Sequence, residues 1–313
     1  IHQPIRIEAL GNGKYRISNK RFHANMEDLY GRYEITEDGR TVCSGNLEDL
    51  KLEAQASKVI TLPDIPATKV PGAEYFINFS FCQKRDTEWA KADYEVATEQ
   101  FKLSSSEKPI FVPEKGNINL NETADALVVK GERFEAVFSK EEGTLSAYTL
   151  NNIPLISKGL ELNLFRAPTD NDVMKGSWYR AHLNDFTVKC YDTAVTSNDT
   201  EVIITVSQSM GWSIHQPFAK LNVTYSVGCK LNISCTAEFS NKVENLPRFC
   251  IRLFMPRSFE AVDYFGYGPH ESYIDKHLSS YMGHFSANIA DMFEDYVRPQ
   301  ENSSHYGCRY VNV

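Results

Sequence analysis

The stretch KLNVTYSVGCKLNISCTAEF, residues 220–239, decides the fold class because apolar and polar residues alternate along both of its halves. In an extended chain, Leu221, Val223 and Tyr225 lie on one face and the polar residues between them lie on the other. This period of two is typical of antiparallel strands that are buried on one face only. The stretch therefore predicts half-buried β-strands.

The same alternation recurs along the chain, and turn-forming residues separate the repeats. Helical periodicity is scarce: residues 176–183 could form one or two turns, and residues 288–297 are ambiguous. These patterns predict an all-β protein. The alternating segments are EYFINFSF (74–81), RFEAVFS (133–139), EVIITVSQ (201–208) and FCIRLF (249–254), and the turn signals are Glu37-Asp38-Gly39, Glu142-Gly143 and Asn151-Asn152.

A chain of 313 residues suggests two domains. The segment SSSEKPIFVPEKGN, residues 104–117, combines serines, prolines and charges between strand patterns, so we expect a linker at residues 106–116. Residues 1–105 have the size of an immunoglobulin-like β-sandwich. Residues 117–313 carry enough strand patterns for large stacked antiparallel sheets.

The composition excludes several classes of partner. The formal net charge is -8 and no long basic run occurs, so we expect neither a nucleic-acid nor an anionic-membrane partner. No apolar run approaches the roughly 18–20 residues of a membrane helix. The seven cysteines are odd in number and form no CxxC motif, so we expect free thiols in a reducing compartment.

The stretch LFRAPTDNDV, residues 164–173, places two aspartates around an asparagine. An EF-hand loop would need a third ligand and a glycine where Met174 and Lys175 stand, so a metal site is not favoured. A catalytic dyad is not favoured either, because the two carboxylates of a glycosidase usually come from separate elements.

We favour a structural loop for this stretch. Aspartate and asparagine side chains accept backbone N–H groups in turns, which suits Asp170 and Asn171. Pro168 restricts the entry to the loop, and we expect Arg166 to pair with a carboxylate.

A second dense stretch, GYGPHESYIDKHL, covers residues 266–278, and Gly268 and Pro269 mark a tight turn within it. His270 and Glu271 could be an acid–base pair, and Tyr273 and Asp275 could bind sugar hydroxyls. The alternative, which we favour, is a buried polar network that fixes a long loop to the sheet. His270, His277 and His284 recur every seven residues. Zinc-binding histidine pairs on a helix are three or four residues apart, so a zinc site is not favoured here.

Three stretches carry a family resemblance: LFRAPTDND (164–172), GYGPHESYIDK (266–276) and YVRPQENSSHYGCRYV (296–311). In this order and spacing they resemble segments of the C-terminal part of bacterial β-galactosidases of glycoside hydrolase family 2. Glu301 matches the third motif, and Ser303 stands where the family usually has glycine. The opening 39 residues also resemble the stretch that follows the catalytic barrel of the family.

The resemblance implies an architecture. Residues 1–105 would be the fourth domain, an immunoglobulin-like sandwich, and residues 117–313 would be the fifth, an antiparallel supersandwich similar to galactose mutarotase. In the family the fifth domain continues for several tens of residues, so we expect this supersandwich to be incomplete at its C-terminus. The absence of an initial Met also leads us to expect a piece of a longer protein.

The resemblance also implies functions. The catalytic glutamates of the family lie on a barrel that this chain does not contain, so no residue here is expected to be catalytic. Bound magnesium and sodium belong to that barrel, and we expect no metal in this chain. The expected partners are the catalytic barrel, a galactoside such as lactose in the whole enzyme, and further copies in a homo-oligomer. The expected location is the bacterial cytoplasm.

Residues 173–183 correspond to a loop near the active-site mouth of the family, although their length and composition differ. Asp172, Lys175 and Trp178 are therefore expected to border the substrate pocket. The residues expected to have structural roles in the motifs are Arg166, Pro168, Asp170, Asn171, Gly268, Pro269, Glu271, Tyr273, Asp275 and Glu301.

Two other functions stay open. A carbohydrate-binding module would use Trp178 and Trp212 as exposed rings that pack on sugars. An aldose 1-epimerase needs a histidine and a glutamate that face one pocket. His270 and Glu271 are adjacent and would point to opposite faces of a strand, which counts against it.

Overall fold

The computed structural model describes residues 3–62, 69–103, 117–212 and 217–313. Nearly all regular structure in these ranges is β-strand, and every pairing of strands is antiparallel. The all-β prediction is confirmed. The chain divides into two compact units, unit 1 (Ile1–Ile110, Glu260–Glu294 and Asn302–Val313) and unit 2 (Phe111–Phe259 and Asp295–Glu301).

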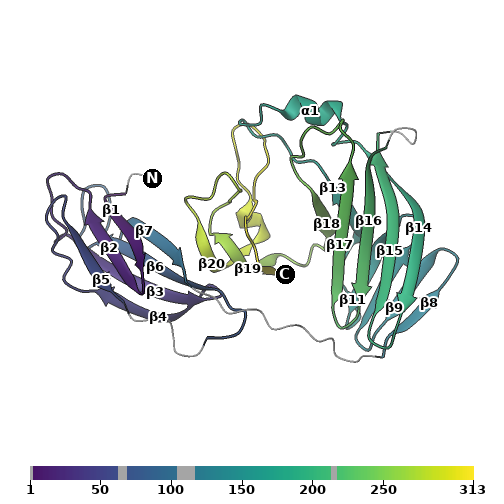
Figure 1. The fold of residues 1–313 in the computed structure, drawn as a ribbon, viewed down its shortest axis with the longest axis horizontal. Helices are drawn as coiled ribbons and strands as arrows, with labels where there is room; N and C mark the ends of the chain where they lie inside the picture. Colours follow the sequence, from purple (N-terminus) through teal and green to yellow (C-terminus); the bar gives the residue numbers. More distant parts are fainter. Residues whose placement is uncertain (1–2, 63–68, 104–116, 213–216) are drawn as a thin grey trace. The chain divides into compact units, whose positions relative to one another are not determined.

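The alternating stretch 220–239 forms the paired strands β16 (Pro217–Val227) and β17 (Leu231–Phe239) of unit 2. They continue a four-stranded sheet whose order is β14-β15-β16-β17, with β14 at Thr187–Ser197 and β15 at Val202–Gly211 (Figure 1). Alternate residues of β15 and β16 are buried, as the period of two predicts. One face of this sheet therefore builds the core of unit 2.

The strands β8–β12 form a second sheet in unit 2, in the order β12-β11-β10-β9-β8. A two-stranded ladder of β13 (Lys158–Asn163) and β18 (Cys250–Phe254) extends the same layer, since β13 lies beside β11. Leu127, Phe138 and Leu145 pack with the inner residues of β15 and β16. The bounds of the five strands are Asn119–Glu122 (β8), Ala126–Lys130 (β9), Phe134–Ser139 (β10), Thr144–Leu150 (β11) and Ile153–Pro154 (β12).

Unit 1 begins with a sandwich of seven strands in two sheets, ordered β1-β2-β5 and β4-β3-β6-β7. The inner residues Ile77, Phe79 and Phe81 of β6 lie in its core, as their alternation predicts. The strands are Ile5–Gly11 (β1), Lys14–Asn19 (β2), Leu29–Glu37 (β3), Arg40–Leu47 (β4), Ser57–Thr61 (β5), Tyr75–Gln83 (β6) and Glu95–Lys102 (β7).

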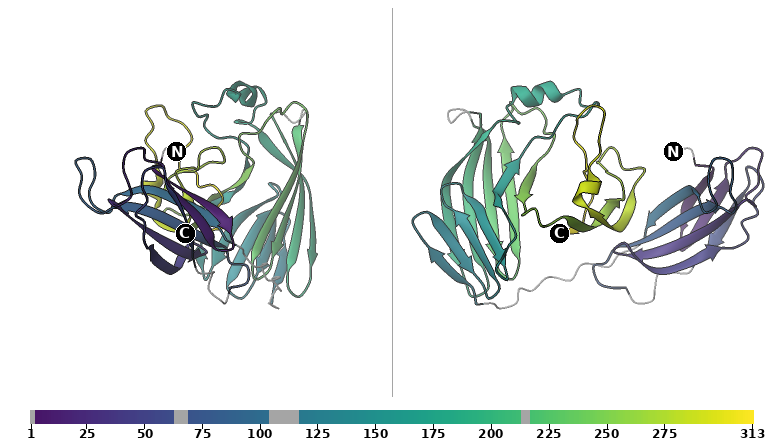
Figure 2. Two further views of the ribbon diagram at one scale, coloured as in Figure 1. Left: turned by 60° about the vertical axis from the view of Figure 1, so that its left-hand side comes forward. Right: turned by 180° about the vertical axis from the view of Figure 1, so that it is seen from behind.

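A third sheet of unit 1 comes from the far end of the chain: β19 (Ala261–Gly268), β20 (Tyr281–Asn288) and β21 (Tyr310–Asn312), with the short 3-10 helix η1 (Ile289–Met292) (Figure 2). Its Phe265 and Met282 pack on Phe76, on the outer face of β6. The Gln100 side chain exchanges two hydrogen bonds with the backbone of Met282, at 2.8 and 2.9 Å.

This packing differs from the linear division at residues 106–116 that the sequence predicts. Because Phe265 and Met282 pack on Phe76, residues 260–294 and 302–313 of the second predicted domain group with unit 1, and the rest of that domain forms unit 2. The predicted linker lies outside the described residues. No helix in the described ranges is long and apolar enough to cross a membrane.

Ile204 and Ile203 test the role of the two faces of β15. Ile204 is fully buried and Ile203 is half-buried on the opposite face. We expect Ile204→Ala to lower the free energy of unfolding by about 3 kcal/mol, since it leaves a cavity in the core. We expect Ile203→Ala to cost about 1 kcal/mol. Equal losses in urea denaturation would contradict this assignment of the faces.

Candidate functional site

The loop that follows Leu164 is closed by an ion pair between Arg166 and Asp172. The guanidinium donates from Nη1 to Oδ2 at 2.6 Å and from Nη2 to Oδ1 at 2.9 Å. Thr169 adds its backbone N–H and its hydroxyl to the same carboxylate, at 2.6 and 2.9 Å. The predicted pairing of Arg166 with a carboxylate is confirmed, and the two-point geometry holds the loop in one shape.

The environment of Asp172 keeps it ionised. Burial favours its neutral form, but the hydrogen bonds from Arg166 and Thr169 outweigh burial and lower the pKa of the carboxyl. A group in this state cannot act as a general acid near neutral pH. Asp170 is exposed, and its Oδ1 lies 3.6 Å from Nη1 of the exposed Arg298. Asn171 is also exposed.

Trp178 lies on the short helix α1 (Lys175–Arg180), which crosses one end of the strands of unit 2 (Figure 1). The Trp178 ring is 4% exposed and packs with Leu164 and Met210. Its indole N–H donates to Asn245 Oδ1 at 2.5 Å. The expectation of an exposed ring at Trp178 is therefore wrong, because the ring fills the end of an apolar core.

The Arg166 guanidinium lies 5.3 Å from the centre of the Trp178 ring, in cation–π range. Trp178 therefore packs its ring against the guanidinium of the ion pair. Trp212 is 61% exposed, as expected, and stacks on His182 with ring centres 4.6 Å apart. Lys175, at the start of α1, is exposed.

The first part of the third motif docks on the same loop. Glu301 accepts the backbone N–H of Ala167 at 3.2 Å and pairs with Arg248. Gln300 accepts the backbone N–H of Asp170 at 3.4 Å. The fold thus joins two motifs that are more than a hundred residues apart, and we call this group of contacts the loop clamp of unit 2.

The second motif forms a separate polar network in unit 1. Glu271 is 8% exposed, binds Lys276 Nζ at 2.6 Å and accepts the backbone N–H of Ser303 at 3.2 Å. The Ser272 hydroxyl accepts the backbone N–H of Tyr306 at 2.8 Å and lies 3.2 Å from the Tyr267 carbonyl oxygen. The buried-network interpretation of this stretch is confirmed.

The acid–base interpretation of His270 and Glu271 fails. His270 is exposed while Glu271 is buried against Lys276, so the two side chains face different surroundings. Asp275 is exposed and Tyr273 is half-buried. The same arrangement counts against the epimerase, which needs both groups at one pocket.

Glycine is required at Gly268, which precedes Pro269 through a cis peptide bond. A Cβ atom there would lie 2.5 Å from Tyr264 Oη and 2.8 Å from the Phe285 ring. Such contacts are too short for any side chain. Close packing of the aromatic rings of β19 and β20 therefore explains this glycine of the motif.

Ser303 adopts a left-handed conformation, with φ of 65°. Glycine is the residue that takes this conformation at least cost, which explains the usual glycine of the family at this position. The Ser303 hydroxyl lies 2.7 Å from the Met292 carbonyl oxygen and 2.6 Å from Asn302 Oδ1. The hydroxyl has one proton to donate, and its hydrogen bond to either oxygen offsets part of the backbone strain.

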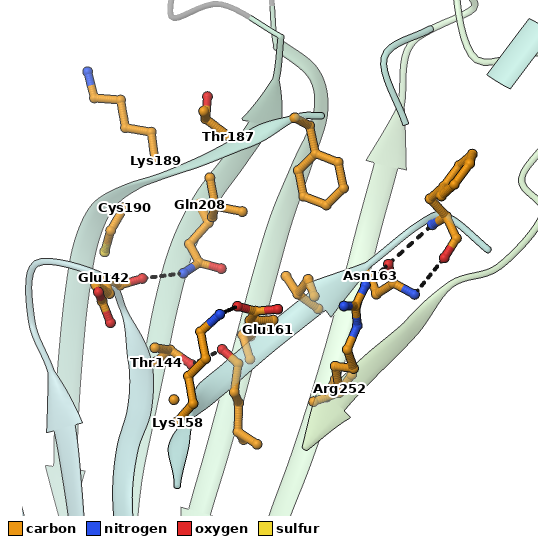
Figure 3. A pocket seen from close by; sticks show the side chains of 18 of the residues that line it. Glu142, Thr144, Lys158, Glu161, Asn163, Thr187, Lys189, Cys190, Gln208 and Arg252 are labelled. Atoms are coloured by element: carbon orange, nitrogen blue, oxygen red, sulfur yellow. Dashed lines mark hydrogen bonds and ion pairs between the residues drawn. The ribbon is translucent and has the colours of Figure 1, made fainter. Parts of the chain in front are cut away.

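A cleft of about 920 Å³ opens in unit 2 between the β13–β18 ladder and the β14–β17 sheet (Figure 3). Its polar side chains bind one another. Glu161 pairs with Lys158, and Arg252 donates to Asn163 Oδ1 at 2.6 Å. Gln208, only 5% exposed, donates to the Glu142 and Gly143 carbonyl oxygens at 2.9 and 3.2 Å.

This cleft was not predicted from the sequence. Gln208 interrupts the apolar row of Val202, Ile204 and Val206, and a polar residue in such a row is the one signal that could have marked it. The predicted pocket residues Asp172, Lys175 and Trp178 are not among the residues that line it. In the described ranges, no group of three or more His, Cys, Asp or Glu side chains is arranged to hold a metal ion.

The fold and these networks define a class: an all-β protein whose sheets carry loops fixed by buried ion pairs. The model of the β-galactosidase small chain family matches residues 130–313, and the model of β-galactosidase domain 4 matches residues 15–104. The chain belongs to the β-galactosidase small chain family.

Relatives with the name β-galactosidase match along the chain. The protein of Actinobacillus pleuropneumoniae is 28% identical over 99% of this chain and 31% of its own length, and that of Streptococcus thermophilus is 28% identical over 100% and 30%. The protein of Staphylococcus xylosus is 34% identical over 56% of this chain. The chain thus spans about a third of the length of the first two.

Replacing Arg166 tests the loop clamp. The side chains of Arg166 and Asp172 are 18% and 14% exposed, so Arg166→Ala leaves a mostly buried carboxylate without its main partner. We expect a loss of about 3 kcal/mol in the free energy of unfolding. The matched control is Arg298→Ala, whose pair with Asp170 is 83% and 64% exposed and should cost close to zero.

The pH dependence follows from the lowered pKa of Asp172. Its stabilising effect is complete above the unfolded pKa of about 3.9 and is lost as pH falls through the lower folded value. The difference between wild type and Arg166→Ala should therefore shrink below about pH 4. Equal effects of Arg166→Ala and Arg298→Ala at pH 7 would refute the clamp.

Two variants of Ser303 separate the backbone from the hydroxyl. Both Ser303→Ala and Ser303→Gly lose the contacts of the hydroxyl, but only glycine relieves the left-handed strain. We expect Ser303→Gly to be more stable than Ser303→Ala by about 0.5–1 kcal/mol in urea denaturation. An alanine variant as stable as the glycine variant would show that the strain is negligible.

Proposed function

We propose that this chain is a non-catalytic part of a β-galactosidase that hydrolyses terminal β-D-galactosides such as lactose. The support is the alignment of 92–100% of the chain with relatives of that name, of which it spans about 30%. Matches to two family models, over residues 15–104 and 130–313, add to it.

The state of the three mostly buried carboxylates of the motifs is the observation that carries this proposal. Asp172 is held by Arg166, Glu271 by Lys276 and Glu301 by Arg248. Retaining hydrolysis needs one carboxylate free to attack the sugar and a second that carries a proton, about 5 Å apart across the scissile bond. Carboxylates that are bound by cations suit neither role.

The chemistry is then supplied by polypeptide outside residues 1–313, which we take to be a catalytic barrel with a retaining mechanism. Any magnesium or sodium would bind to that barrel, and this chain would hold none. The seven free cysteines suit a reducing compartment, so we place the enzyme in the bacterial cytoplasm. The whole enzyme would be a homo-oligomer.

The part played by this chain is to hold loops in place. The loop clamp fixes the exposed residues Val173 to Lys175, which lie between Asp172 and α1. We propose that these residues face the mouth of the galactoside pocket. Trp178 would then contribute indirectly: its ring packs against Arg166 and does not contact the sugar.

A second candidate function is carbohydrate binding by the isolated chain. The observation in its favour is the exposed Trp212 ring, one face of which stacks on His182. An exposed aromatic face can pack on the apolar face of a sugar ring. Titration calorimetry with galactose and lactose decides: heat at millimolar sugar that disappears in Trp212→Ala would favour this function.

An assay with a chromogenic β-galactoside tests the main proposal. We expect the chain of residues 1–313 to give no turnover above the uncatalysed rate, and the whole polypeptide to hydrolyse the substrate. A double variant, Asp172→Asn with Glu271→Gln, is the control for any residual rate. Turnover by the chain alone that this double variant abolishes would show that the chemistry resides here.

A further inference from the structure

The cleft of unit 2 has the size of a small-molecule site. Its volume is about 920 Å³, and pockets that bind small ligands measure about 300–1,000 Å³. Leu160 and Leu162 of β13 line one wall, and Val223 and Tyr225 of β16 line the wall of the other layer. The cleft therefore offers two apolar walls to a ring that enters between the layers.

The charges of the cleft cancel. Three cationic and three anionic side chains line it, so their formal charges sum to zero. They are Lys158, Lys189, Arg252, Glu141, Glu142 and Glu161. Lys158 already pairs with Glu161, and Arg252 already donates to Asn163. A charged ligand would lose its water here without an available opposite charge, so the cleft suits an uncharged ligand.

One buried side chain has a hydrogen-bonding atom left for such a ligand. Gln208 is 5% exposed and lies in the inner row of β15. In the part of the chain that the structure describes, its Nε2 donates to the carbonyl oxygens of Glu142 and Gly143, and its Oε1 accepts no hydrogen bond. Figure 3 shows this oxygen turned away from Glu142, toward the side of the cleft where Lys158 and Glu161 lie. A buried acceptor is costly unless a donor reaches it, and this donor has to come from the cleft.

These three features together select a class of ligand. The ligand must carry no charge, must donate a hydrogen bond to Gln208 and must present apolar faces to the two walls. A sugar meets all three requirements, since its hydroxyls donate and the C–H groups of its ring form apolar faces. A hydrocarbon chain has no donor for the amide oxygen.

We propose that the cleft of unit 2 is a binding site for an uncharged mono- or disaccharide, one hydroxyl of which donates to Gln208 Oε1. The sugar ring lies between the walls of β13 and β16. This site is distinct from the exposed ring of Trp212, which is not among the described residues that line the cleft. The inference does not need the proposed function, because binding here requires no hydrolysis.

Cys190 provides a natural reporter of occupancy. Its half-buried thiol lines the cleft. A Cβ atom on Gly143 would lie 2.8 Å from both Cys190 Sγ and Gln208 Nε2, so the thiol and the amide are neighbours. A sugar bound to Gln208 should therefore hinder reagents that approach this cysteine.

Alkylation by iodoacetamide, followed at each cysteine by mass spectrometry, tests the proposal on the chain of residues 1–313. We expect galactose or lactose at millimolar concentrations to slow the alkylation of Cys190 several-fold, with a dose dependence that saturates. Cys229, exposed in the turn between β16 and β17, is the internal control, and its rate should not change. A rate at Cys190 that is the same with and without sugar would overturn the proposal.

Two matched variants test the role of the amide oxygen by titration calorimetry. Gln208→Met removes the acceptor and nearly keeps the length of the side chain. We expect it to weaken sugar binding at least about tenfold, since one buried hydrogen bond is lost. Ser207→Ala, on the opposite face of β15, should leave the affinity unchanged. Unchanged affinity in Gln208→Met would contradict the proposal. Urea denaturation checks that this variant folds, and if it does not, the protection of Cys190 in the wild type decides.

Three further outcomes would also overturn the proposal. Galacturonate, a charged analogue, should bind at least about tenfold more weakly than galactose, and binding as tight as that of galactose would refute an uncharged ligand. Heat that Trp212→Ala abolishes, without protection of Cys190, would place the sugar on the Trp212 ring. Galactose that protects Cys190 in the chain but not in the whole polypeptide would show that other polypeptide covers the cleft.

Discussion

The two-point ion pair between Arg166 and Asp172 is the interaction on which the organisation of the motif loops depends. It closes a loop that carries exposed backbone donors, and these donors then become the docking points for Gln300 and Glu301. A buried pair of this kind contributes little net stability, because both charges lose water. Its value is geometric: one loop shape is selected, and a distant segment is positioned by it.

The same principle governs the second network, with different residues. Glu271 is buried and binds both a lysine and the backbone of Ser303. In each network one carboxylate joins segments that no strand pairing connects. The cost of burying the charge is offset by hydrogen bonds from more than one donor. Sheets thus build the body of the protein, and single carboxylates fix its loops.

Much of this fold could be predicted from local patterns. Alternation such as that of Leu221, Val223 and Tyr225 reports burial on one face of a strand, and the structure places all three in the core. The structural role of Arg166 was predictable because few groups satisfy a guanidinium in a proline- and aspartate-rich loop. The grouping of Phe76 with Phe265 was not, since nothing in an alternating strand tells which distant strand covers its other face.

In the candidate site too, some features could be predicted from the sequence and others could not. Trp178 was misjudged because a tryptophan in loop-like sequence has equal local character whether its ring faces solvent or a core. The cleft was missed because its polar residues come from strands that are neighbours only in three dimensions. The pairs of Glu161 with Lys158 and of Arg252 with Asn163 depend on the register of β13 and β18, which periodicity alone does not determine.

The division of the third motif between the two units has a consequence for how the chain can be cut. Glu301 belongs to the contacts of unit 2, while Ser303, two residues later, belongs to those of unit 1. The chain passes between the units after Ile110, Phe259, Glu294 and Glu301. A single break in the backbone therefore cannot release either unit, and neither can be expressed as one continuous segment. A protease that nicks one connection leaves both units tied together through the remaining three.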